Sequence, residues 1–160
     1  MLFAFEKSVG AVVFRRENNE IKYLLLDHGN GYWNFPKGHT EEKETNEETL
    51  RREVEEETGL EDVKILPFFK QRAFYFYQAK GREKAERKTA GRALNIFKMV
   101  VFYLTEVKSQ EVRVSSEHIG FAWLKFEEAL EKLQYKNSKT LLQKAQAELE
   151  KYFAKKESLG

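Results

Sequence analysis

Three glutamates, Glu53, Glu56 and Glu57, are spaced so that a helix would place their carboxylates on one face. Three negative charges within one helical turn repel one another, so the arrangement is mildly unfavourable in isolation. It becomes favourable when a divalent cation lies on that face, because carboxylate oxygens are hard ligands that suit magnesium, manganese or calcium. The alternative is a glutamate-rich helix face exposed to solvent. The spacing makes this segment a candidate metal site.

Residues around these glutamates supply further parts of such a site. In the upstream segment FPKGH, Pro36 restricts the backbone and Gly38 allows a main-chain carbonyl to approach the helix closely. Magnesium is commonly bound through a few carboxylates together with waters and substrate phosphates. Arg52, one residue before Glu53, can hold a carboxylate in place through a bidentate pair. A loop oxygen and the helix carboxylates could therefore share one cation.

The full spacing from Gly38 to Leu60 resembles the Nudix box, G-x5-E-x7-R-E-U-x-E-E-x-G-U, in which U is aliphatic. Every defined position matches: Gly38, Glu44, Arg52, Glu53, Val54, Glu56, Glu57, Gly59 and Leu60. The resemblance implies a Nudix hydrolase, which uses magnesium or manganese to hydrolyse a nucleoside diphosphate linked to a further group. It also implies that the three helix glutamates ligate the metal with the Gly38 carbonyl, while Glu44 and Arg52 support the geometry of the site.

Two segments outside the box resemble the asymmetrical diadenosine tetraphosphate hydrolases. The chain has their W-x-x-P-K-G-H segment, which begins at Trp33, and their E-H-x-x-x-x-W-L segment, which begins at Glu117. The sequence departs from many of these hydrolases at Tyr32, where they have histidine before the tryptophan. This closer resemblance narrows the expected substrate to a dinucleoside polyphosphate.

The same resemblance implies roles for side chains outside the acidic helix. It places Lys37 and Lys98 near the substrate phosphates and Glu117 on a loop at the metal cluster. It also implies that Tyr75 and Tyr135 enclose the adenine, and stacking on an aromatic ring is worth roughly 1–3 kcal/mol per base. Packing in the core or exposure at the surface is the alternative reading of both tyrosines.

Tyr32 and His39 are further candidate substrate contacts, because each adjoins the W-x-x-P-K-G-H segment or lies within it. For His39, as for His118, a structural role is the alternative. Trp33 and Trp123 are expected to be packing residues.

Hydrolysis of a phosphoanhydride needs charge neutralisation and a water molecule in line with the leaving group. Metal ions supply the first and lower the pKa of water. A carboxylate can then accept the proton, and the candidates for this general base are Glu57, Glu117 and Glu53. The sequence favours Glu57 or Glu117 without deciding between them.

The leading hypothesis is therefore a hydrolase that depends on Mg²⁺ (or Mn²⁺) and cuts diadenosine tetraphosphate asymmetrically into ATP and AMP. A second hypothesis is an RNA 5′-triphosphate pyrophosphohydrolase, because the segment Lys80 to Arg92 has six basic residues against two acidic ones. Cleavage of (d)NTPs or other nucleotide conjugates is a third. A non-catalytic nucleotide-binding or RNA-binding module is disfavoured, because every carboxylate of the box is present.

Composition limits the class of protein. The 160 residues suit one domain, spanning 1–160, and the absence of cysteine excludes disulfides and favours a reducing, cytoplasmic setting. The apolar runs are too short to cross a bilayer and the N-terminal residues do not form a signal peptide, so no membrane partner is expected. The net charge of +2 indicates no nucleic-acid partner by itself, and the oligomeric state stays open.

The elements expected around the site are, in order, a β-hairpin, a strand–loop–helix, more strands and then helices. A hairpin is predicted from Ser8 to Arg16 and from Glu20 to His28, followed by a Gly/Pro/Asn loop. Thr45 and Glu48 fit a capping box for a helix from about Asn46 to Thr58, and Gly59 suits its C-terminus.

Further along the chain, VKILPFFKQ and AFYFYQ predict two separate strands, and Leu94 to Val107 predicts a central one. Lys80 to Arg92 is expected to be a loop or insertion. EVRV, at Glu111 to Val114, is read as a strand, followed after a loop by another strand and then by helices in FEEALEKLQY and SKTLLQKAQAELEKYFA. The expected fold class is α/β (α+β): the Nudix fold, a mixed sheet between helices with a loop–helix–loop box.

Overall fold

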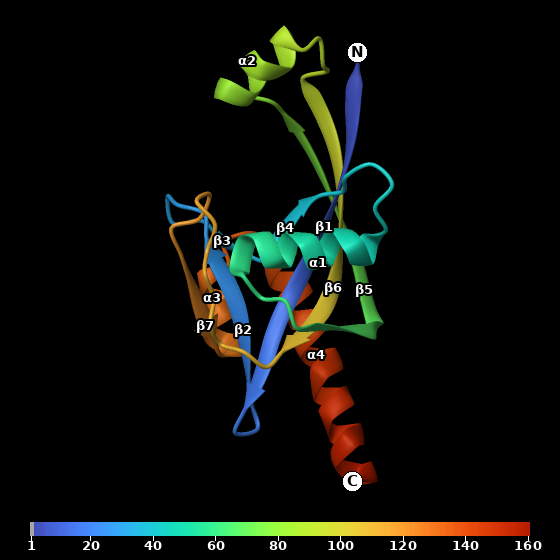
Figure 1. Ribbon diagram of the computed structural model, residues 1–160, viewed down its shortest axis with the longest axis vertical. Helices are drawn as coiled ribbons and strands as arrows, with labels where there is room; N and C mark the ends of the chain where they lie inside the picture. The colour runs from blue at the N-terminus through green and yellow to red at the C-terminus, as the bar shows by residue number, and fades with distance from the viewer. Residues whose placement is uncertain (1) are drawn as a thin grey trace.

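A computed structural model describes residues 2–160. The described residues form seven strands and four helices, in the order β1-β2-β3-β4-α1-β5-α2-β6-β7-α3-α4, and Figure 1 shows them around one sheet. The strands are β1 (Phe3–Glu17), β2 (Glu20–Asp27), β3 (Trp33–Asn34), β4 (Lys37–His39), β5 (Val63–Gln78), β6 (Asn95–Val107) and β7 (Gly120–Leu124). The helices are α1 (Asn46–Thr58), α2 (Gly81–Thr89), α3 (Phe126–Lys132) and α4 (Lys136–Leu159).

The sheet is mixed and has β1 at its centre. Its strand order is β3-β2-β1-β6-β5, with β4 paired to β1 and β7 paired to β2. Strands β1 and β6 run parallel, while the other pairs are antiparallel. This architecture confirms the mixed sheet between helices that the sequence predicts.

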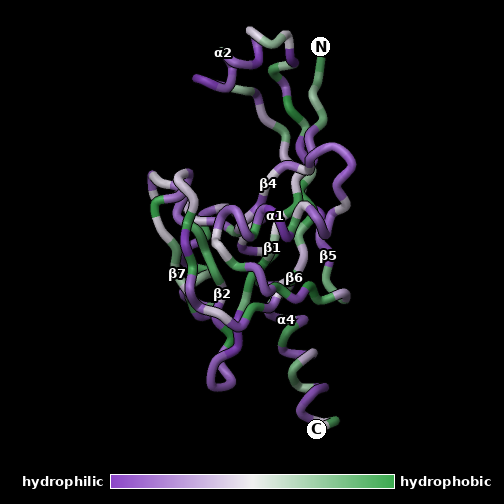
Figure 2. Tube along the Cα trace, viewed as in Figure 1, coloured by the Kyte–Doolittle hydropathy of each residue, from purple (hydrophilic) through white to green (hydrophobic). Residues whose placement is uncertain are grey.

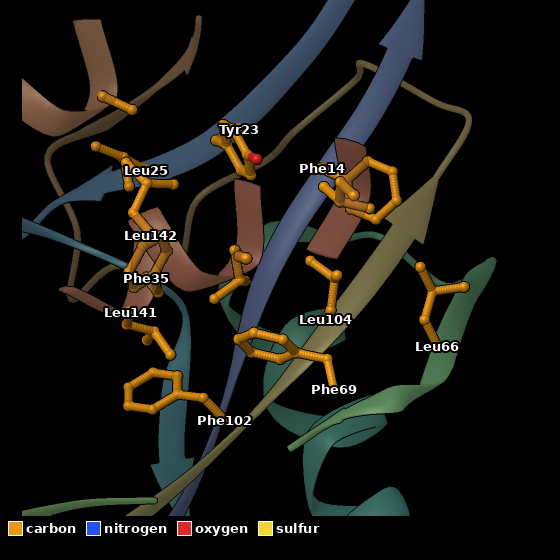
Figure 3. Close-up of a cluster of buried hydrophobic side chains, with 14 of the residues drawn as sticks. Phe14, Tyr23, Leu25, Phe35, Leu66, Phe69, Phe102, Leu104, Leu141 and Leu142 are labelled. Carbon is orange, nitrogen blue, oxygen red and sulfur yellow. The ribbon is translucent and has the colours of Figure 1, made fainter. Parts of the chain in front are cut away.

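Alternation along β1 divides its buried residues between two cores. Val12 and Phe14 belong to the core beneath α4, with Leu142 and Phe102 (Figure 3). Val9, Ala11 and Val13 pack on the other face, against Leu50 and Val54 of α1. Because successive side chains of a strand point to opposite faces, one apolar strand can hold a helical layer on each side. Figure 2 shows the resulting hydrophobic centre of the sheet.

The β1–β2 hairpin and helix α1 form as their local sequences predict. Asn18 and Asn19 connect the two strands, both with positive φ, which is the conformation that a two-residue hairpin turn requires. Helix α1 covers Asn46–Thr58, with the Thr45 capping box at its start and Gly59 at its end with φ of 75°. The box helix therefore has defined ends on both sides of its glutamates.

The predicted loop at Lys80 to Arg92 is wrong, because residues 81–89 form helix α2. Ion pairs between residues four apart, Arg82 with Glu86 and Glu83 with Arg87, support this polar helix. Arg87 is 4% exposed and also pairs with Glu6 of β1. A contact between distant segments thus fixes a helix whose own sequence has little apolar periodicity.

Two strand predictions also differ from the structure. VKILPFFKQ and AFYFYQ form one strand, β5, with an irregularity in its pairing to β6 between Leu66 and Lys70. EVRV forms no strand, because its backbone bonds to the end of α1 instead: the Arg113 and Ser115 N–H groups donate to carbonyls of Thr58 and Glu57. This segment consequently closes over the C-terminal end of the box helix.

The end of the sheet nearest the N-terminus extends past α1. There the first residues of β1, the end of β5 and the start of β6 form a three-stranded extension, with α2 at its tip (Figure 1). Among residues 2–160, no helix is both long enough and apolar enough to cross a bilayer.

Candidate active site

Strand β4 brings the FPKGH segment against helix α1. β4 pairs with β1 through Gly38 opposite Val9, so its position is set by the sheet rather than by a free loop. The Glu53 carboxylate lies directly against the Gly38 backbone, in the space where a Cβ atom would be. Only glycine therefore allows this carboxylate and the β4 main chain to be so close.

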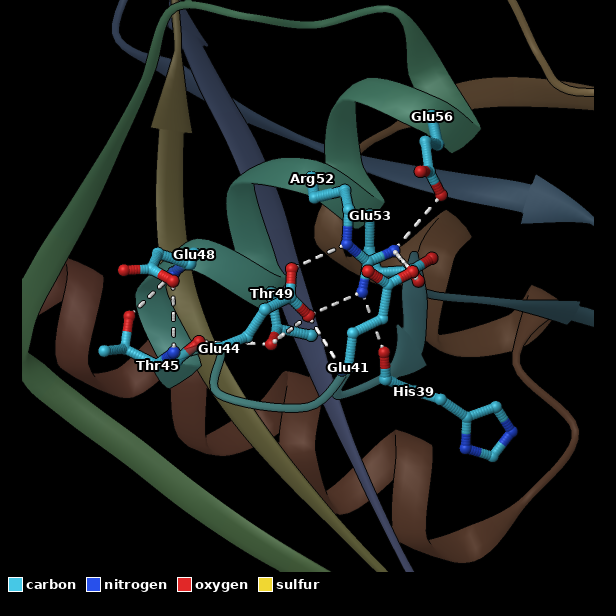
Figure 4. Close-up of polar contacts among 9 residues, drawn as sticks. All are labelled: His39, Glu41, Glu44, Thr45, Glu48, Thr49, Arg52, Glu53 and Glu56. Atoms are coloured by element: carbon cyan, nitrogen blue, oxygen red, sulfur yellow. Dashed lines mark hydrogen bonds and ion pairs between the residues drawn. The ribbon is translucent and has the colours of Figure 1, made fainter.

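Arg52 connects four of the predicted site residues, Glu44, Glu53, Glu56 and His39 (Figure 4). Its Nε and Nη2 donate to the two oxygens of Glu44 at 2.7 and 2.8 Å. Nη1 donates to Glu53 Oε1 at 2.7 Å and to Glu56 Oε2 at 3.3 Å, while Nη2 also donates to the His39 carbonyl at 2.9 Å. One guanidinium thus holds the loop before α1 and two of its glutamates together.

Both carboxylate oxygens of Glu44 accept hydrogen bonds. Its Oε1 also accepts hydrogen bonds from the Glu41 backbone at 2.8 Å and from the Thr49 hydroxyl at 3.1 Å. The hydrogen bond from Arg52, followed by the one from Glu41, lowers the pKa of Glu44 to about 2. Glu44 is therefore ionised at neutral pH and holds Arg52 in place through both of its oxygens.

Glu53 and Glu57 form the buried part of the acidic face. Glu57 is 7% exposed, and its Oε2 accepts a hydrogen bond from the Lys37 backbone N–H at 3.2 Å. Burial, and then the charge of Glu53, raise the pKa of Glu57 to about 8. Burial also raises the pKa of Glu53, which Arg52 partly offsets. Two adjacent carboxylates that resist ionisation together are a place where positive charge would be stabilising.

The remaining two predicted ligands lie at the edge of this pair. Glu56 has a side chain that is 58% exposed and contacts Arg52. Glu117 precedes β7 on the loop that closes over α1, and its charge contributes to the raised pKa of both Glu53 and Glu57. The structure thus brings the Glu117 loop to the acidic helix face, as the resemblance implies.

Within residues 2–160, no three acidic or histidine side chains are gathered closely enough to enclose a cation directly. Arg52 binds both Glu53 and Glu56, so these two carboxylates face a guanidinium. The donor chemistry nevertheless fits a hard divalent cation: the Glu53 carboxylate lies against a glycine that leaves room for close approach.

A cavity of about 480 Å³ opens beside the acidic face. The residues that line it are Tyr32, Asn34, Lys37, Tyr75, Tyr77, Lys98, Tyr135 and Ser138. Five of these are predicted substrate contacts: Tyr32 just before β3, Lys37 of β4, Tyr75 of β5, Lys98 of β6 and Tyr135 just before α4. His39 lies outside this lining, and its carbonyl binds Arg52 instead.

The two lysines of the cavity are held in low-polarity surroundings. Burial, and then the charge of Lys98, lower the pKa of Lys37 to about 8. Burial also lowers the pKa of Lys98, which occupies β6 directly opposite Tyr75 of β5. Lys37 Nζ lies 5.5 Å from the centre of the Tyr75 ring. The negative charge of a polyphosphate in this cavity would favour the protonated, charged form of both lysines.

The aromatic residues surround the same space. Tyr32 contacts Tyr135 edge to face, with ring centres 5.4 Å apart, and its hydroxyl accepts a hydrogen bond from Asn34 at 2.7 Å. Tyr135 is 57% exposed at the position before α4. An exposed ring beside a cavity is available to stack on a planar ligand.

Sequence reasoning missed Asn34, Tyr77 and Ser138. Tyr77 had a usable signal, because the two-residue period of AFYFYQ places it on the same face as Tyr75. Asn34 and Ser138 had none, since their proximity depends on the packing of α4 against β3. The Ser138 hydroxyl donates to Asn34 Oδ1 at 3.2 Å.

His118 has a structural contact that supports the Glu117 loop. Its ring packs edge to face on His28, with centres 4.6 Å apart, and its Nδ1 is 2.9 Å from the Ser115 hydroxyl. Burial and the nearby His118 lower the pKa of His28 to about 4, so His28 is neutral at physiological pH. Neutral imidazoles can pack together without charge repulsion.

Comparison with known proteins gives a consistent result. The NUDIX domain family matches residues 4–145. An asymmetrical bis(5′-nucleosyl)-tetraphosphatase of Mus musculus is 34% identical over 149 residues, covering 86% of this chain and 90% of that protein. Its Caenorhabditis elegans counterpart is 27% identical, covering 88% of this chain and 94% of that protein. A crystal structure of a C. elegans Ap4A hydrolase binary complex superposes with a TM-score of 0.70 at 28% identity, over 90% of this chain and 97% of that one.

Proposed function

The chain belongs to the Nudix family and is a hydrolase of pyrophosphate bonds, and from this premise we propose that it cuts diadenosine tetraphosphate asymmetrically, into ATP and AMP. The observation that carries the proposal is the cavity next to the acidic helix face. It combines two lysines with three tyrosines that sequence reasoning singles out, as a substrate with several phosphates and two bases requires. The similarity to curated hydrolases of this substrate class supports the same choice.

The residues of the chain divide the work by position. Glu53, Glu56, Glu57 and Glu117, with the Gly38 carbonyl, would hold the divalent cation. That cation, Mg²⁺ or Mn²⁺, would neutralise phosphate charge and activate water when bound. Arg52 orients Glu53 and Glu56 through its own hydrogen bonds, and Glu44 fixes Arg52.

The cavity side chains position the substrate. Lys37 and Lys98 bind the polyphosphate, and the rings of Tyr75 and Tyr135 hold a base by stacking. Tyr32 supports Tyr135 through their edge-to-face contact. Proton transfer from water requires a carboxylate within hydrogen-bond reach, and Glu57 and Glu117 are the candidates.

The experiment is incubation of the pure protein with diadenosine tetraphosphate and Mg²⁺, with products separated by ion-exchange chromatography. Equal amounts of ATP and AMP are expected. Production of ADP alone, or turnover of a (d)NTP in preference to this substrate, would contradict the proposal. The variant Glu57→Gln is the matched negative control, because its side-chain oxygen can still accept the hydrogen bond from Lys37 while the carboxylate charge is lost.

A second candidate is hydrolysis of triphosphorylated RNA 5′ ends, and helix α2 is the observation that favours it. Lys84 and Lys88 lie one turn apart on α2, and both are exposed. If they contact an RNA backbone, replacing both by alanine should weaken RNA turnover and make its dependence on salt shallower. The matched control replaces Lys155, an exposed lysine of α4. An unchanged salt dependence in the α2 variant would remove this candidate.

A further inference from the structure

The three-stranded extension carries a group of exposed phenylalanines, which we call the aromatic patch. The exposed fractions are 54% for Phe3, 64% for Phe5, 53% for Phe74, 62% for Phe76 and 37% for Phe97. Scattered single apolar residues are normal on a protein surface, whereas a contiguous group of this size marks an interaction site. Figure 2 shows hydrophobic stretches, in green, along the strands of this extension.

Strand pairing places all five rings on one face. Phe5, Phe97 and Phe76 are direct partners across β1, β6 and β5, so their side chains point the same way. Phe3 and Phe74 lie two residues from these rows and share their face. The ring centres are 5.6 Å apart for Phe3–Phe76, 5.8 Å for Phe5–Phe97 and 5.7 Å for Phe74–Phe97. The rings therefore form a nearly continuous surface.

The centre of the patch carries no charged side chain, unlike the opposite face of the same strands. At one edge lie Asn95 and Gln78; at the other lie Lys7, in the same row as Met99 and Phe74, and Arg72, two residues before Phe74. Lys7 donates a hydrogen bond to Asn46 of α1. The opposite face carries Glu6 and Lys98, directly paired across β1 and β6. A two-fold contact brings identical surfaces together, so an uncharged centre can meet its own copy while the two cations stay at the edge.

The exposed area matches the lower limit for a specific dimer. A phenylalanine can bury about 150–250 Å², and the exposed fractions together equal between two and three whole side chains. Each copy therefore offers about 500 Å² of aromatic surface, and two copies would bury about 1,000 Å² in total. This area is at the lower end of the range seen for specific protein–protein interfaces.

We propose that the aromatic patch is the interface for a second copy of this chain, packed sheet face to sheet face about a two-fold axis. Sheets pack in this way at about 10 Å separation, with the inner side chains interdigitated. The candidate active site uses Lys98 and Tyr75, which point to the opposite face, so both cavities of the dimer stay open. The interface is independent of the substrate proposed above.

Sedimentation velocity from about 1 µM to about 100 µM protein tests the proposal. The native chain should convert from a monomer of 18.9 kDa to a species of twice that mass as the concentration rises. The variants Phe76→Lys and Phe76→Glu should each remain monomeric, because like charges would meet across the two-fold axis. An equimolar mixture of the two variants should recover the dimer.

Controls separate this interface from general stickiness. The variant Leu159→Lys removes an exposed apolar side chain, 79% exposed at the far end of α4, and should dimerise normally. Circular dichroism checks that each variant is folded, and Phe5→Lys provides a second variant on another strand. A native chain that stays monomeric, mass that grows without stopping at two copies, dimers that survive both Phe76 variants, or binding to phosphatidylcholine vesicles in place of dimers would each overturn the proposal.

Discussion

Arg52 and Glu44 form a bidentate ion pair, with Nε donating to Oε2 at 2.7 Å and Nη2 donating to Oε1 at 2.8 Å. The pair joins helix α1 to the loop that precedes it. Because the guanidinium is planar, fixing two of its nitrogens on Glu44 also fixes the direction of Nη1, which binds Glu53 and Glu56. The acidic face is therefore oriented by a residue that is not part of the cavity lining.

Replacing Arg52 by lysine should lower kcat/KM by about 100-fold, since a small displacement of the carboxylates is costly to a positioned reaction. Lysine keeps the charge and loses the planar fork. The matched control is Arg51→Lys on the same helix, because Arg51 pairs with the exposed Glu47 and donates to the Val63 carbonyl. Steady-state kinetics should show a change of less than about 3-fold for the control. Equal losses in both variants would mean that any arginine on α1 is needed for folding rather than for orientation.

Replacing Gly38 by alanine should displace Glu53, because the new methyl group would occupy the space of that carboxylate. We expect loss of metal-dependent activity together with a lower thermal unfolding midpoint. Gly120→Ala is the control, since no heavy atom lies within 4 Å of a Cβ built there and its φ is not left-handed. Titration calorimetry with Mg²⁺ measures the effect directly, and unchanged Mg²⁺ affinity in Gly38→Ala would contradict the role given to this backbone.

Replacing Tyr135 by alanine should raise KM by roughly 5- to 150-fold, which corresponds to the loss of one stacked base. The unfolding midpoint should change little, because the side chain is 57% exposed. Tyr135→Phe keeps the aromatic face and should keep most of the affinity. A similar loss in the phenylalanine variant would show that the hydroxyl, rather than stacking, makes the contact.

The raised pKa of Glu57 predicts how stability changes with pH in metal-free protein. Its pKa rises from 4.5 to about 8 on folding, so the folded state binds the proton more tightly. This contribution is fully present below pH 4.5 and is lost as the pH rises to about 8, amounting to a few kcal/mol at most. The histidines act in the opposite direction, since burial lowers their pKa, so the contribution of Glu57 must be isolated by difference.

The measurement compares the native chain with Glu57→Gln by thermal unfolding between pH 5 and pH 8, the window that the two pKa values define. Relative to Glu57→Gln, the unfolding midpoint of the native chain should fall by roughly 5–10 °C as the pH rises across this window. Above pH 8 the lowered pKa of Lys37 begins to act in the opposite direction, so the window ends there. A constant difference would show that Glu57 titrates normally.

Magnesium should reverse this trend, because a cation favours the ionised carboxylates of Glu53 and Glu57. We expect the midpoint to rise more on addition of Mg²⁺ at pH 8 than at pH 6, and the rise to be absent in Glu57→Gln. Calcium and sodium at equal ionic strength separate specific binding from screening. A rise of the same size in the variant would place the cation elsewhere.

The box helix could be predicted to the residue because its signals are local. Thr45, Glu48 and Gly59 define its ends through contacts within a few residues, and these contacts form wherever the helix packs. Helix α2 lacked such signals: its first residue is glycine and it has no side-chain cap. Its position depends on Arg87 reaching Glu6, which lies 81 residues earlier in the chain. Contacts of this range are not visible in a local pattern.

The strand prediction at Glu111 to Val114 failed for a related reason. The alternation of apolar residues is real, and Val112 and Val114 do pack against the α1 core. Their backbone groups bond to the end of α1, however, so the apolar pattern predicts burial correctly and the partner wrongly. Propensity describes a half-buried extended segment, while pairing is decided by the tertiary structure.

Some residues of the candidate site could be predicted from the sequence and others could not. Lys98 is implied by the resemblance to the tetraphosphate hydrolases, and the structure places it in the cavity lining. Ser138 and Asn34 meet only because α4 returns across the sheet, 104 residues after β3. Residues that meet only through such long-range packing have no characteristic spacing in the sequence.

Phe97 and Lys98 are neighbours in β6 with side chains on opposite faces of the extension, one in the aromatic patch and the other in the cavity. A single-residue insertion or deletion earlier in this strand would exchange them, placing a phenylalanine ring in the cavity and a lysine in the aromatic patch. A single change would therefore disrupt both the aromatic patch and the cavity. Changes of chain length are therefore tolerable at the tip around α2 and intolerable in the strands that carry it.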